Sequence, residues 1–102
     1  MTAIAQPAYR FTPDYIVLTP PGKVLAEKIH EMGIDVSELA RRCELPLETI
    51  RQVLDTEIVV TKEIAETLEK ATWIPAKNWL RYEENYRKRL ELVKQYPEKA
   101  VY

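Results

Sequence analysis

Residues 35–55 read DVSELARRCELPLETIRQVLD, and this stretch decides the fold. Asp35 followed three residues later by Glu38 is the capping-box pattern of a helix start. Pro46 fits only at the start of a helix, because proline in a helix interior removes a hydrogen bond. The stretch therefore predicts two short helices, over about residues 36–42 and 47–55, joined by about four residues. That spacing is typical of a helix-turn-helix.

Apolar side chains follow one face of each predicted helix. In the second helix they fall within about 120° of arc when each residue turns by about 100°, and they are Leu47, Ile50, Val53 and Leu54. The opposite face of this helix is polar. We therefore expect it to look outward, as a recognition helix does when it enters a DNA major groove.

Three further helices complete the expected fold. Thr19 is expected to cap the first, with Pro20 in its first turn and Gly33 as a left-handed cap at its end. Thr61 is expected to cap the fourth, and Pro75 to open the fifth and longest. These signals predict an all-α, five-helix bundle with a long C-terminal helix.

The chain of 102 residues has room for one domain. We expect an N-terminal arm at 1–18, the helix-turn-helix domain at 19–96 and a frayed tail at 97–102. The β-favouring runs are residues 15–18 and 58–60, which are too short to compete with the helices.

Composition narrows the function classes. Hydrophobic residues at 46% and charged residues at 30% are globular values, and no stretch has the length of a membrane span or the pattern of a signal peptide. The single Cys43 and single His30 cannot assemble a zinc site or an internal disulfide. No nucleophile is paired with an obvious base. We expect a cytoplasmic protein that is not an enzyme and has no metal or cofactor.

The outward face of the helix at 47–55 is chemically mixed. Arg51 and Gln52 suit guanine and adenine, because a guanidinium or an amide can pair with a base edge through two hydrogen bonds. Glu48 and Asp55 oppose DNA binding, because phosphates repel carboxylates. Residues 36–60 hold three basic side chains against five acidic ones, a net charge of −2, so the expected recognition unit lacks the usual excess of positive charge.

Four further segments are distinctive: FTPDYIV at 11–17, PPGKVL at 20–25, GIDVSELARR at 33–42 and WIPAKNWL at 73–80. Together with Tyr86-Arg87 they resemble HigA-type antitoxins, which are helix-turn-helix proteins of the lambda-repressor-like (XRE) class. The resemblance implies a five-helix domain that forms dimers, represses its own operon at a palindromic operator and neutralises a HigB (RelE-like) mRNA-cleaving toxin.

The resemblance also implies which residues face DNA. Carried over position by position, they are Ser37, Leu47, Glu48, Arg51 and Gln52. We expect Arg51 and Gln52 at bases, and the phosphate contacts to come from Ser37, Thr49 and Arg41 or Arg42.

The chain departs from the HigA pattern at several positions. Val36 stands where the family commonly has Gln, and Pro46 where it has Ser. Glu44, Thr56-Glu57 and Trp73 stand where the family has Gly, Gly-Lys and Gly, and Asn78 replaces an aromatic residue. These changes near the recognition helix remove polar groups or positive charge, or add negative charge. The domain shape tolerates them more easily than DNA contact does.

The last helix carries a long aromatic and aliphatic stripe. Its members lie within about 80° of arc and are Trp79, Tyr82, Tyr86, Leu90 and Val93, with Tyr96 at the edge. Either the stripe packs across the first and fourth helices, or its distal half forms a dimer seam or docks a partner. The pairs Glu83/Arg87 and Glu84/Lys88 are expected on an ordinary solvated face.

The leading hypothesis is a HigA-like antitoxin and transcriptional regulator, with operator DNA, a second copy of the chain and a RelE-like toxin as partners. Two alternatives stay open. One is a protein-interaction module that keeps the helix-turn-helix but has lost DNA binding, which the acidity of residues 44–57 favours. The other is a stand-alone phage-type repressor without a toxin.

Overall fold

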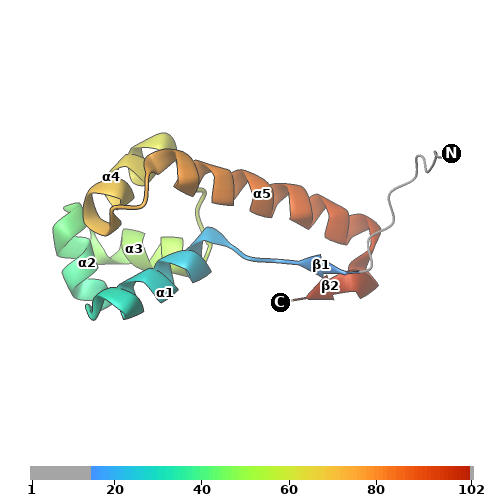
Figure 1. Cartoon of the computed structure of the whole chain (residues 1–102), viewed down its shortest axis with the longest axis horizontal. Helices are drawn as coiled ribbons and strands as arrows, with labels where there is room; N and C mark the ends of the chain where they lie inside the picture. Colours follow the sequence, from blue (N-terminus) through green and yellow to red (C-terminus); the bar gives the residue numbers. More distant parts are fainter. Residues whose placement is uncertain (1–14, 102) are drawn as a thin grey trace, which may run out of the picture.

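The computed structural model describes residues 15–101, so most of the expected N-terminal arm lies outside the described residues. The described residues form five α-helices and a small ribbon of two strands (Figure 1). The helices are α1 Pro21–Met32, α2 Val36–Cys43, α3 Leu47–Leu54, α4 Lys62–Thr72 and α5 Ala76–Gln95. The strands are β1 Ile16–Val17 and β2 Ala100–Val101, and a 3-10 helix at Pro97–Lys99 precedes β2. The predicted all-α bundle of five helices is confirmed.

Local capping chemistry sets most of the helix ends. Asp35 Oδ1 accepts a hydrogen bond from Glu38 N at 2.8 Å, and Thr61 Oγ1 accepts one from Ile64 N at 3.3 Å. Gly33 ends α1 in the left-handed conformation, with φ 72°. The expectation that Thr19 caps α1 is wrong by one residue. Pro20 is the cap, because a residue that precedes a proline is pushed into extended backbone.

The core lies where the first four helices meet the start of α5. Ile50, Leu68 and Trp79 are fully buried in it, together with Leu25 from α1 and Leu39 from α2. On α4, Ala65 is fully buried, whereas its neighbour Ile64 is only partly buried against the cluster.

The start of α1 lies against the end of α3. A Cβ atom added at Gly22 would lie 2.2 Å from the backbone oxygen of Leu54 and 2.5 Å from that of Val53. Only glycine permits this approach, because backbone atoms cannot move aside as a flexible side chain can. Gly22 therefore fixes how closely α1 approaches the end of α3.

The C-terminal residues are ordered by a long-range contact. β1 and β2 pair in parallel, with Ile16 opposite Ala100 and Val17 opposite Val101. Leu18 N donates to Val101 O at 2.9 Å. The expectation of a frayed tail is therefore wrong for residues 97–101, because residues 97–99 form a 3-10 helix and residues 100–101 pair with β1.

The molecule is elongated, with principal extents of 55 × 24 × 22 Å. Figure 1 shows that the distal part of α5 runs beyond the other four helices, and that the β1–β2 ribbon lies at this end. Arg89 Nη1 donates to Val17 O at 3.2 Å and ties the ribbon to α5. Within residues 15–101, no helix is both long enough and apolar enough to cross a lipid bilayer.

Among residues 15–101, three residues other than glycine have left-handed backbone conformations: Glu44 with φ 55°, Thr56 with φ 59° and Trp73 with φ 67°. These are the three positions at which the resemblance to HigA proteins implies glycine. Each costs on the order of 1 kcal/mol or more relative to glycine, because the Cβ atom crowds the carbonyl oxygen. The chain therefore keeps the left-handed turns of the fold without glycine, the residue that adopts this conformation at the lowest cost.

Candidate nucleic-acid interface

The turn between α2 and α3 is a tight and well-bonded corner. Glu44 caps α2, and Leu45 N donates to Ala40 O at 3.1 Å. Ala40 is only 6% exposed, and its small side chain lets α3 cross close to α2. Ile50 is fully buried and Leu45 half-buried beside it. The two helices are therefore held at a fixed angle, as a helix-turn-helix requires.

The polar face of α3 is open to solvent, as the sequence predicts. Glu48, Arg51 and Asp55 are exposed, and Thr49 and Gln52 are half-buried. The Arg51 guanidinium makes no ion pair or hydrogen bond within residues 15–101. It is therefore free to bind an incoming acceptor, although two carboxylates lie on the same face.

Leu47 is expected both in the buried apolar stripe of α3 and among the residues that face DNA. The structure leaves it 37% exposed at the first turn of α3, while Ile50 and Val53 carry the packing. Leu47 is thus at the rim of the core, where it is accessible from outside. Its position suits contact with a ligand better than a role in the apolar stripe.

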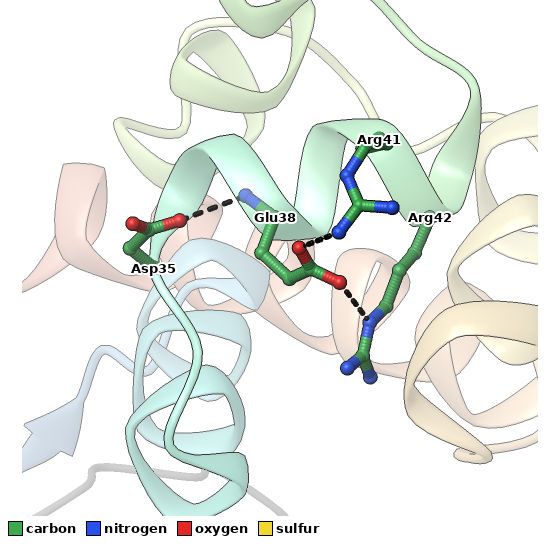
Figure 2. Close-up of polar contacts among 4 residues, drawn as sticks. All are labelled: Asp35, Glu38, Arg41 and Arg42. Atoms are coloured by element: carbon green, nitrogen blue, oxygen red, sulfur yellow. Dashed lines mark hydrogen bonds and ion pairs between the residues drawn. The ribbon is translucent and has the colours of Figure 1, made fainter.

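Arg41 and Arg42 are already paired with a carboxylate of their own helix. Figure 2 shows both guanidinium groups turned toward Glu38. Arg42 Nε donates to Glu38 Oε2 at 2.8 Å, and Arg41 Nη2 donates to Glu38 Oε1. The hydrogen bond from Arg42, followed by that from Arg41, holds the pKa of Glu38 below its usual value. A phosphate would have to compete with Glu38 for both arginines.

The first turn of α2 also carries negative charge. Ser37 is exposed there, as expected for a phosphate contact. Two residues earlier, the Asp35 carboxylate caps the helix, and the Glu38 side chain turns to the arginines rather than back to the cap. The expected capping box is therefore only half formed. Ser37 thus stands between two acidic residues in the sequence, Asp35 and Glu38, and both disfavour a phosphate.

The α5 stripe divides into a buried part and a half-buried part. Trp79 is fully buried in the core, so its expected place in an interface is wrong. Tyr82 stands edge-on to Trp79, with 5.6 Å between ring centroids, and packs against the core. Tyr86, Leu90 and Val93 are half-buried on the part of α5 that runs beyond the bundle. Only these three remain candidates for an interface centre.

Glu83 is not on a solvated face, contrary to the sequence-based expectation. It is 7% exposed, and its Oε1 accepts from Val60 N at 3.0 Å. Its Oε2 pairs with Arg87 Nε. This carboxylate fixes the segment after α3 against α5. No local signal could identify it, because the i,i+4 pattern of Glu83 and Arg87 is the same as that of the exposed pair Glu84 and Lys88.

His30 and Cys43 do not lie on the polar face of α3. His30 is exposed on α1, and Cys43 is buried, with its Sγ 4.0 Å from Thr67 O. Burial raises the pKa of the Cys43 thiol to about 11, so the thiol stays protonated and poorly nucleophilic near neutral pH. Among the described residues, no group of three or more His, Cys, Asp or Glu side chains is arranged to hold a metal ion.

Solved structures of other proteins have a fold similar to that of this chain. An antidote protein of a plasmid maintenance system from Nostoc punctiforme superposes with a TM-score of 0.73 and 23% identity over 81% of this chain and 91% of that one. A HigA-family addiction module antidote protein from Coxiella burnetii gives 0.69 and 23% over 82% and 95%. The chain has the fold of HigA-type antidote proteins.

A third similar structure contains DNA. PA4674 from Pseudomonas aeruginosa, solved in complex with its 28-bp operator, gives a TM-score of 0.70 and 17% identity over 78% of this chain and 89% of that one. No protein-family model and no curated protein matches the sequence. At these identities the likeness establishes the fold, and function must be argued from the residues of this chain.

Proposed function

We propose that this chain is a HigA-like antitoxin and transcriptional regulator that binds operator DNA as a dimer. The observation that carries the proposal is the open polar face of α3, on a helix-turn-helix fold that it shares with an operator-bound protein. On this face Arg51 is exposed and unpaired within residues 15–101. A free guanidinium at that place can make two hydrogen bonds to guanine.

The roles follow from the positions of the side chains. Arg51 and Gln52 would read bases from α3, with Leu47 and Glu48 at its leading end. Ser37 and Thr49 would contact phosphates. Arg41 and Arg42 would do so only after giving up part of their interaction with Glu38, since a guanidinium shared with a carboxylate attracts phosphate less strongly.

Arg51→Ala tests this proposal. We expect it to weaken binding to the operator by about 1 to 3 kcal/mol and to leave folding unchanged, because the side chain is exposed. The matched control is Arg81→Ala on α5, which removes another exposed arginine with no ion pair in the described part of the chain. The candidate operator is the DNA upstream of the gene, assayed by electrophoretic shift. Equal affinities of the two variants would remove Arg51 from the interface.

A second candidate function is a protein-interaction module that has lost DNA binding. The pairing of Glu38 with both arginines favours it, together with the carboxylates of Glu48 and Asp55 beside Arg51. Binding to random duplex at two salt concentrations separates the two functions. A DNA-binding protein loses affinity steeply as salt rises, whereas a pure interaction module binds duplex at neither concentration.

Glu38→Gln sharpens that comparison. If the chain binds DNA, this variant frees Arg41 and Arg42 and adds about one phosphate contact, which steepens the salt dependence by a slope of about 0.9. If the chain does not bind DNA, the variant changes nothing measurable with duplex. Glu63→Gln, a carboxylate on α4 without an ion pair in residues 15–101, is the matched control for net charge.

The dimer is proposed to form along the distal half of α5. Tyr86, Leu90 and Val93 are half-buried there, on the part of α5 that runs beyond the other helices and contacts β1, and tyrosine is favoured at interfaces. Analytical ultracentrifugation should give twice the chain mass at micromolar concentration, and Tyr86→Ala should raise the dissociation constant. A monomer at every concentration would refute the seam.

The toxin partner and the cytoplasmic location are proposed from the fold of the antidote proteins. A reading frame for a small basic RNase-like protein next to the gene would supply the toxin. Co-expression of the two should relieve growth inhibition by that protein. Growth arrest that this chain does not relieve would favour the stand-alone repressor.

A further inference from the structure

Trp73 is placed in solvent at the junction of α4 and α5. Its side chain is 86% exposed and its backbone is left-handed, with φ 67°. The junction itself is firmly held. Trp73 N donates to Glu69 O at 2.8 Å, and the buried Thr72 hydroxyl donates to Leu68 O and accepts from Ile74 N. The indole is therefore presented by a fixed backbone.

Folding does not explain a tryptophan at this position. A glycine would relieve the left-handed strain and would remove a large apolar side chain from water. The other tryptophan, Trp79, is fully buried and already fills space in the core. Trp73 is therefore too exposed to have a packing role, and its role must be to bind another molecule.

An open groove lies beside the Trp73 side chain. Its volume is about 650 Å³, and its lining residues are Glu66, Glu69, Lys70 and Trp73. Glu69 Oε1 accepts from Ala76 N at 3.0 Å, whereas the Glu66 carboxylate has no partner within the described residues. The groove thus has an aromatic surface beside two carboxylates, one of them unpaired. These carboxylates outnumber the single ammonium group in the groove.

This combination selects a cation with a flat face. A guanidinium stacks on an aromatic ring and at the same time binds a carboxylate through its planar N–H groups. Phosphate or an anionic membrane is disfavoured, because the carboxylates outnumber the lysine in the groove. We propose that the groove formed by Glu66, Glu69, Lys70 and Trp73 docks an arginine side chain from a basic segment of a partner protein.

The docking groove is formed by α4 and the α4–α5 junction, away from the polar face of α3, although Trp73 also lines a second hollow with Lys28 and Arg42. The groove is a surface on which a protein partner of the proposed antitoxin could dock. This inference rests on the proposed function in one respect, that such a partner exists. It predicts the chemistry of the segment that binds: at least one arginine, in an overall basic surface.

The test uses the full chain, a capped hexa-arginine peptide as the probe and the two indole N–H signals in an NMR spectrum. We expect a saturable shift of the Trp73 signal, while the Trp79 signal stays fixed because that ring is buried. Glu66→Gln should weaken binding about threefold, as loss of an exposed ion pair implies. Glu98→Gln removes the same charge from the 3-10 helix that follows α5 and should leave affinity unchanged.

Trp73→Gly supplies the second variant and should abolish the heat of peptide binding in calorimetry. It relieves the backbone at φ 67°, so lost binding cannot be ascribed to unfolding. It should bind operator DNA as the unmodified chain does, so that failure of this site and failure of DNA binding are distinguishable.

Three results would overturn the proposal. One is no shift of the Trp73 signal with hexa-arginine. Another is an equal shift with a hexa-glutamate peptide or in Glu66→Gln, which would mean that the carboxylate does not select the ligand. The third is a shift of the same signal when the chain is diluted without peptide, which would make the occupant a second copy of this chain.

Discussion

Replacing Glu83 with alanine removes the only buried carboxylate among the described residues. Two groups that bind this carboxylate then lose their partner. Val60 N, in a residue 3% exposed, loses its acceptor, and Arg87 loses its ion pair. A buried donor left unpaired costs about 1 to 3 kcal/mol. Arg87 is 43% exposed and can be hydrated, so its share is at most about 1 kcal/mol. We expect Glu83→Ala to lower the free energy of unfolding by about 3 kcal/mol.

Two further variants separate these contributions. Glu83→Gln keeps an oxygen that can accept from Val60 N and loses only the ion pair, so we expect a loss of about 1 kcal/mol. Glu84→Ala is the matched control. Its pair with Lys88 spans 3.3 Å between side chains that are 64% and 71% exposed, and its loss should cost less than about 0.5 kcal/mol.

The assay is urea unfolding followed by circular dichroism at 222 nm, with the midpoint and slope fitted for each variant. The expected order of stability is Glu84→Ala, then Glu83→Gln, then Glu83→Ala. If Glu83→Ala unfolds at the same midpoint as Glu84→Ala, the buried hydrogen bond to Val60 does not hold the segment after α3, and the reasoning fails.

Three other predictions concern single residues. Gly22→Ala should cost more than about 2 kcal/mol in urea unfolding, because its Cβ would lie 2.2 Å from Leu54 O; an unchanged midpoint would contradict this close approach. Glu44→Gly should stabilise the chain by about 1 kcal/mol, since φ is 55° there, and a lower melting temperature would count against strain at this cap. The Cys43 thiol should react with a disulfide reagent at pH 8 only after unfolding. Burial raises its pKa from 9.0 to about 11, so its contribution to stability is complete below pH 9 and is lost as pH rises toward 11; rapid labelling of the native chain would show that the thiol is accessible.

Several parts of the fold were predictable because their causes are local. Asp35, Gly33 and Thr61 end or begin helices through bonds to residues at most four positions away. The outward face of α3 follows from the spacing of Ile50 and Val53, which forces the polar residues to the other side. The same spacing correctly predicted that the Arg51 side chain is exposed. Periodicity and capping need no knowledge of the rest of the chain.

The candidate site was predictable in outline but not in its electrostatics. The sequence gives the charges of Arg41, Arg42 and Glu38, and a helix puts them within reach of one another. It does not say whether Glu38 bonds back to the cap or forward to the arginines. The structure has both arginines on the carboxylate, and this choice lowers the positive charge that the site offers to DNA.

Local sequence accounts for the helices, their caps and the polar face of α3, because each depends on neighbours within about four residues along the chain. Packing between distant elements decided which side chains of α5 are buried, since Trp79 and Glu83 meet partners from other elements. It also decided that the C-terminal residues pair with β1, a contact between segments more than 80 positions apart. Contacts of that range depend on how whole helices pack, and no local pattern encodes them.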